Sequence, residues 1–91
     1  MERVAITISG KVIGVFFRIH IRDLAKDLGV TGYVKNTAEN NLFLVAEGEK
    51  ETIKKLIDFC KKGPKDANVE NIKIEKEAFK NEFNDFLIEY E

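Results

Sequence analysis

The spacing of apolar residues changes along the chain, and each change marks a boundary between predicted elements. Residues 3–12 alternate between apolar and polar side chains, a period typical of a half-buried strand. Residues 17–28 carry apolar side chains three or four positions apart, which places them on one face of a helix. Gly29 follows, and glycine is common where a helix ends. This part of the chain therefore predicts a strand followed by a helix.

Two further strands are predicted over residues 31–36 and 41–47. The turn between them contains Asn40 and Asn41, and asparagine tolerates the left-handed backbone that a tight hairpin needs. The two strands therefore predict a β-hairpin.

A second helix is predicted after Gly48, with apolar residues at helical spacing, and it ends at Gly63-Pro64. Residues 69–76 return to strand-like alternation. A last strand is predicted through Phe86, Ile88 and Tyr90.

The predicted order of elements is strand, helix, strand, strand, helix, strand, with a short terminal strand. This order is typical of the α+β class with a ferredoxin-like, split βαβ arrangement. We expect one antiparallel sheet with both helices on one face, in a single domain over residues 1–91.

Net charge and the length of the apolar runs exclude some classes of protein. The formal net charge is -1, which argues against a protein that binds nucleic acid through a basic field. No apolar run is long enough to span a bilayer, and no secretory leader precedes the first strand, so we expect a cytoplasmic monomer without a membrane partner. Lysine is abundant relative to arginine, a bias reported for hyperthermophile proteins. A thermophilic protein is therefore a hypothesis that a melting curve can test.

The most informative segment joins the first strand to the first helix, from Gly10 to Arg18. Two glycines, Gly10 and Gly14, flank a turn that leads directly into the helix. The first amides of a helix have no intrahelical acceptor and lie at the positive end of its dipole, so such a turn can bind an anion. The dipole disfavours a cation at Arg18, while a guanidinium beside open amides suits bidentate phosphate binding. From these residues alone, a surface arginine after a glycine turn stays an open alternative.

The segment Gly-Lys-Val-Ile-Gly-Val-Phe-Phe-Arg, residues 10–18, resembles the signature Gly-x-Val-Gln-Gly-Val-x-Phe-Arg of the acylphosphatase family. Residues 32–36, Gly-Tyr-Val-Lys-Asn, are similar to the family's second signature, Gly-aromatic-Val-x-Asn. The resemblance extends over nearly the whole chain. It implies the same ferredoxin-like fold and an enzyme that hydrolyses acyl phosphates to a carboxylate and inorganic phosphate.

The resemblance also implies a site with few parts. The phosphate would be bound by the loop amides of Ile13, Gly14, Val15, Phe16, Phe17 and Arg18, with the Arg18 side chain on its oxygens. Asn36 would orient the attacking water. No metal and no cofactor is implied, and inorganic phosphate is expected to be both product and competitive inhibitor. A carboxylate is a weak base that can leave without protonation, so positioning and charge stabilisation suffice.

Two positions depart from the family pattern. Ile13 stands where the family has glutamine, which keeps the amide but removes a polar side chain that could brace the loop. Asn40 stands where a hairpin glycine is usual, a replacement that the left-handed conformation tolerates. Ile13 leaves open a second hypothesis, a catalytically inactive ferredoxin-like module that binds an anion or has a regulatory role.

Other residues that could carry chemistry have simpler interpretations. We expect His20 at the surface, Cys60 in the core of the second helix, and Lys61 and Lys62 in solvent. Ser9 and Thr37 could donate hydrogen bonds near the site. Five phenylalanines are expected to pack in the core: Phe43, Phe59, Phe79, Phe83 and Phe86.

Overall fold

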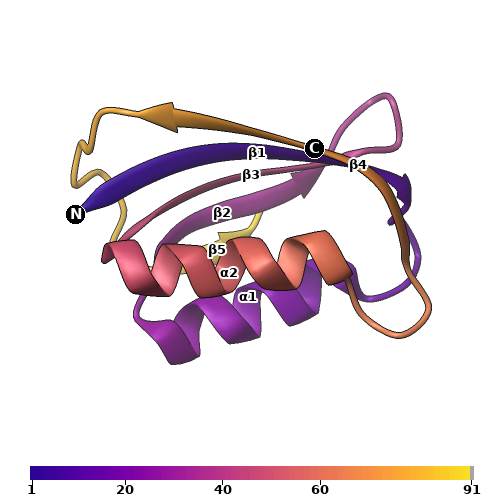
Figure 1. Cartoon of the computed structure of the whole chain (residues 1–91), viewed down its shortest axis with the longest axis horizontal. Coiled ribbons are helices and arrows are strands. Elements are labelled where there is room, and N and C mark those ends of the chain that lie inside the picture. Colours follow the sequence, from indigo (N-terminus) through magenta and orange to yellow (C-terminus); the bar gives the residue numbers. More distant parts are fainter. Residues whose placement is uncertain (91) are drawn as a thin grey trace.

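The computed structural model describes residues 1–90, so the last residue of the predicted 1–91 domain lies outside the described residues. The elements in chain order are β1 (Glu2–Lys11), α1 (Phe17–Leu28), β2 (Thr31–Asn36), β3 (Leu42–Gly48), α2 (Lys50–Lys62), β4 (Asn68–Glu77) and β5 (Phe86–Ile88). Figure 1 shows both helices side by side beneath one face of the sheet. The predicted ferredoxin-like order of elements and the two-layer arrangement are confirmed.

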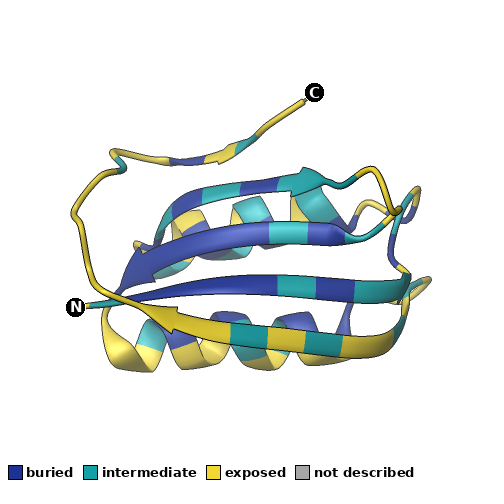
Figure 2. Cartoon of the chain, turned by 90° about the horizontal axis from the view of Figure 1, so that it is seen from above, coloured by how far each residue is buried: buried dark blue, intermediate teal, exposed yellow. Residues whose placement is uncertain are grey.

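The strands are ordered β4-β1-β3-β2-β5 across the sheet. Neighbours among β1 to β4 are antiparallel, as expected, but β5 pairs with β2 in parallel, so the sheet is mixed. The cause is the path of residues 78–85, which lead around the end of the sheet where β1 and β2 both begin (Figure 2). A strand that starts from that end must run in the same direction as β2.

The core lies between the sheet and the helices. It is built from the inward-facing side chains of β1, β2 and β3 and from one stripe of each helix, including Ile6, Leu44, Ile21 and Leu56, none of which is measurably exposed. In Figure 2 burial is concentrated in the central strands, whereas β4 is largely exposed at the sheet edge. Burial of apolar surface, at about 25 cal/mol per Å², holds the two layers together.

The opposite face of the sheet contains a buried ion pair. Arg3 is 7% exposed and Glu47 1%, and Arg3 Nη1 donates to Glu47 Oε2 at 3.2 Å. The same guanidinium donates to Glu77 at 2.8 Å and to Glu82 at 2.7 Å. Glu47 also accepts the backbone N–H groups of Lys80 (2.7 Å) and Glu82 (3.1 Å). This network fastens the β4–β5 connection to the sheet, which sets where β5 begins.

We predict that Glu47→Gln lowers the free energy of unfolding by about 2 kcal/mol at neutral pH, because hydrogen bonds to a charged group are stronger than those to a neutral one. Burial raises the pKa of Glu47, but the two backbone donors and Arg3 outweigh it, so its pKa lies below the ordinary value of 4.5. A carboxylate with a lowered folded pKa stabilises the protein fully above its ordinary pKa and loses that contribution as the pH falls through the folded value.

Urea unfolding of wild type and variant at neutral pH and about pH 3 therefore measures a smaller difference at the acidic value. The matched control is Glu75→Gln, because Glu75 is exposed on β4 and pairs with Lys73 only at 3.9 Å. We expect this control to stay within about 0.5 kcal/mol of wild type. Equal destabilisation by both variants would contradict the prediction.

The expectation that five phenylalanines pack in the core is confirmed for Phe86 and wrong for Phe79, which is 39% exposed. Phe59 packs at the core margin, where its ring lies edge-on to that of Phe17. Phe83 lies on the far face, with its ring 5.9 Å from that of Tyr33 and under the Arg3 guanidinium. Phe43 is half-buried on this far face as well, with its ring 6.2 Å from that of Tyr33, because successive side chains of a strand alternate between the two faces of the sheet.

Candidate active site

The loop between β1 and α1 has an unusual backbone. Gly14 has a φ of 75°, and Phe16, the N-cap residue of α1, has a φ of 60°. A left-handed conformation at a bulky residue costs free energy and persists only where the surroundings enforce it. The neighbours Val15 and Phe17 supply that restraint, because both side chains are buried in the core.

The amides of this loop are unpaired. In the described part of the chain, no hydrogen bond is donated by the backbone N–H groups of residues 13–18. The first turn of α1 has no side-chain cap and no acidic residue, so the positive end of the helix dipole is not offset there. An added Cβ at Gly14 would meet nothing within 4 Å, which shows open space over the loop. The arrangement can accept an anion.

Arg18 lies in the first turn of α1 and is half-buried. Its guanidinium lies over the Tyr90 ring, with 5.4 Å between Cζ and the ring centroid. Two cavities, of about 350 and 310 Å³, are both lined by Arg18 and Tyr90. The charged group therefore stands between two open spaces.

Asn36 ends β2 and lines the smaller of these cavities together with Arg18. Its Oδ1 is buried and has no hydrogen-bond partner among residues 1–90. A buried polar atom without a partner costs free energy unless water or a ligand satisfies it. The structure therefore brings the two residues singled out from separate motifs to one cavity.

The hairpin turn holds the end of β2 in place. Thr37 donates its N–H to the carbonyl of Asn41 at 2.8 Å, and its hydroxyl accepts the N–H of Asn41 at 3.2 Å. Asn40 adopts the expected left-handed backbone, with a φ of 62°. Ser9 donates to the carbonyl of Asn71 at 3.5 Å, on the side of β1 that pairs with β4.

Comparison with known proteins identifies the family of this chain. A family model described as Acylphosphatase matches residues 4–88. The chain belongs to the acylphosphatase family. A curated acylphosphatase from Pelotomaculum thermopropionicum is 40% identical over 97% of this chain and 96% of its own length.

Solved acylphosphatase structures share the fold. That from Bacillus subtilis is similar with a TM-score of 0.94 at 26% identity, covering 99% of this chain and 100% of the other. That from Coxiella burnetii has a TM-score of 0.91 at 38% identity and covers 97% and 92%. Family and fold together support acylphosphatase activity.

The departure from the acylphosphatase signature at Ile13 has a structural explanation. The Ile13 side chain is half-buried and packs against the core. Apolar packing thus braces the loop at the position where the family pattern has an amide side chain. Of the six predicted phosphate-binding residues, Gly14, Phe16, Phe17 and Arg18 line the larger cavity, while Ile13 and Val15 have their side chains against the core.

Sequence reasoning did not single out Tyr90 or Glu89 for this acylphosphatase site, although both line the smaller cavity. Tyr90 was predicted to continue the last strand, but β5 ends at Ile88. In the sequence, Tyr90 is recognisable only as an aromatic residue just after the terminal strand. A role for Tyr90 in the site can be inferred only once β5 is known to pair with β2.

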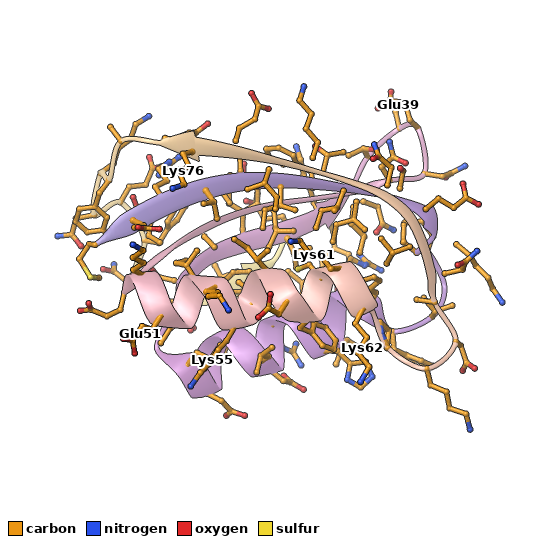
Figure 3. The ribbon with its side chains drawn as sticks, in the orientation of Figure 1. Glu39, Glu51, Lys55, Lys61, Lys62 and Lys76 are labelled. Carbon is orange, nitrogen blue, oxygen red and sulfur yellow. The ribbon has the colours of Figure 1, made fainter. Side chains whose placement is uncertain are left out.

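The remaining candidates stand apart from the site. His20 is exposed, and Cys60 is buried in the core, as expected. Burial raises the pKa of the Cys60 thiol to about 12. Lys61 and Lys62 are exposed, and Figure 3 shows them on α2 together with Lys55.

Among residues 1–90, no three histidine, cysteine or acidic side chains come close enough together to hold one metal ion. Neither α1 nor α2 has the length and hydropathy that a membrane-spanning helix requires.

Proposed function

We infer that the enzyme hydrolyses acyl phosphates by direct attack of water on phosphorus. The observation that carries this proposal is the shared cavity of Arg18 and Asn36 beside a loop whose amides have no acceptor within the described chain. The phosphoryl group binds the amides of residues 13–18, and the Arg18 guanidinium neutralises charge on its oxygens.

The side-chain amide of Asn36 forms a hydrogen bond with the attacking water and sets its direction. The water oxygen forms the new bond to phosphorus while the bond from phosphorus to the carboxyl oxygen breaks. The electron pair of the broken bond leaves with the carboxylate, and the proton of the water passes to a phosphate oxygen or to solvent. The products are a carboxylate and inorganic phosphate. The protein supplies positioning and charge stabilisation, which phosphoryl transfer chiefly requires.

Hydrolysis of benzoyl phosphate in ¹⁸O-labelled water tests this proposal. We expect turnover that inorganic phosphate inhibits competitively, with the label in phosphate and not in benzoate. Label in benzoate would overturn attack at phosphorus. Phosphate binding without turnover would instead support the inactive anion-binding module that the replacement at residue 13 left open.

A further inference from the structure

The larger cavity is more apolar than a phosphate site alone requires. It shares Gly14, Phe16, Phe17 and Arg18 with the loop, and Ile19, Ile88 and Tyr90 also line it. Arg18 is the only charged residue among residues 1–90 that lines it. A volume of about 350 Å³ is within the range of pockets that bind small organic ligands.

Exposed apolar side chains gather around this cavity. Phe16 is 71% exposed, Ile19 39% and Tyr90 78%. They make up half of the six large apolar residues that are exposed in the described chain. Single exposed apolar residues are ordinary, but a cluster around one opening marks a binding surface. The left-handed backbone of Phe16 is a further cost of holding its side chain outside the core.

The geometry of the reaction indicates which part of the substrate binds in the larger cavity. In-line displacement places the attacking water and the leaving carboxylate on opposite sides of phosphorus. Asn36 lines the smaller cavity and is not among the residues that line the larger one. The attacking water therefore lies in the smaller cavity, and the leaving group lies in the larger cavity.

We propose that Phe16, Ile19, Ile88 and Tyr90 form an acyl subsite that selects acyl phosphates with aromatic or branched apolar acyl groups. The inference rests on the proposed function and adds the substrate class. Among the described residues that line the larger cavity, an acyl group with a carboxylate substituent meets no cation except Arg18, which the phosphate occupies. Pockets of this kind discriminate by tenfold or more for each group of methylene size that is buried or lost. We expect kcat/KM for benzoyl phosphate to exceed that for acetyl phosphate by about tenfold or more.

The test compares Ile19→Gln with a matched control, Leu87→Gln. Leu87 is 55% exposed on β5 and lines neither cavity. We expect Ile19→Gln to lower the benzoyl-to-acetyl ratio of kcat/KM by about fivefold to tenfold, while Leu87→Gln leaves it unchanged. The loss should fall on KM, because an apolar contact remote from phosphorus is equal in the ground and transition states.

A binding experiment separates this inference from the catalytic proposal. Phenacylphosphonate and acetonylphosphonate replace the bridging oxygen of benzoyl and acetyl phosphate by methylene and cannot be hydrolysed. Wild type should bind phenacylphosphonate more tightly, and Ile19→Gln should reduce that preference even if no acyl phosphate turns over. Equal affinities, or a ratio of kcat/KM that both variants leave unchanged, would overturn the subsite. A change of oligomeric state in Ile19→Gln without a change in the ratio would also overturn it.

Discussion

Arg18→Gln will lower kcat/KM for benzoyl phosphate by about 10³-fold or more, the scale seen when a transition-state arginine or an oxyanion donor is removed. Glutamine can donate hydrogen bonds, but it carries no charge to neutralise the phosphoryl oxygens. Inorganic phosphate should also inhibit the variant more weakly, because the ground-state anion uses the same guanidinium. Initial rates with and without added phosphate measure both effects.

The fold should survive this substitution. Arg18 makes no ion pair with a carboxylate in the described structure, and the helix dipole disfavours a cation in the first turn of α1. The matched control is Arg22→Gln, one turn further along the same helix, where the side chain pairs with Asp23 at 3.1 Å in an exposed position. We expect Arg22→Gln to retain nearly full activity. A comparable loss in both variants would indicate damage to α1 and not removal of a phosphate ligand.

Asn36→Ala will lower kcat for benzoyl phosphate by about 10²-fold to 10³-fold, the scale at which one positioned polar group contributes to a transition state. The inhibition constant of inorganic phosphate should change little, because orienting a water does not involve the bound anion. The two substitutions therefore have different kinetic signatures: Arg18→Gln weakens phosphate binding, whereas Asn36→Ala slows the chemical step.

Stability gives a second measurement at Asn36. Its Oδ1 is buried and has no partner in the described part of the chain, so removing the side chain also removes an unsatisfied acceptor. Thermal unfolding of Asn36→Ala should show a Tm no lower than wild type while activity falls. Asn84→Ala, at an exposed position in the β4–β5 connection, is the matched control and should keep wild-type kinetics. A large drop in Tm with a proportionate loss of rate would show that Asn36 is structural.

Both variants address residues that sequence motifs identified. The contacts that position the rest of the site could not be identified in this way. The Arg3–Glu47 pair joins residues 44 positions apart, and nothing in the local pattern of β1 or β3 indicates it. Even so, this pair and its neighbours fasten the connection that starts β5 at the correct end of the sheet. The position of Tyr90 over Arg18 depends on that same path.

The interpretation of residue 13 changed for a similar reason. In the sequence, Ile13 is only the loss of a polar side chain from a signature loop. In the structure it is an apolar contact between the loop and the core. Because core packing joins residues from several elements, the compensating contact becomes visible only when those elements are assembled.

The sequence by itself determined the order of helices and strands, the glycines that end both helices and the two motifs that resemble one family, because these depend on residue spacing within a single segment. Only the tertiary structure decided that β5 runs parallel to β2, that Arg18 and Asn36 line one cavity, and that exposed apolar side chains surround a second cavity beside it. The physical reason is that each of these features requires packing between segments far apart in the chain, and a local hydrophobic period carries no information about which distant segment will be the neighbour.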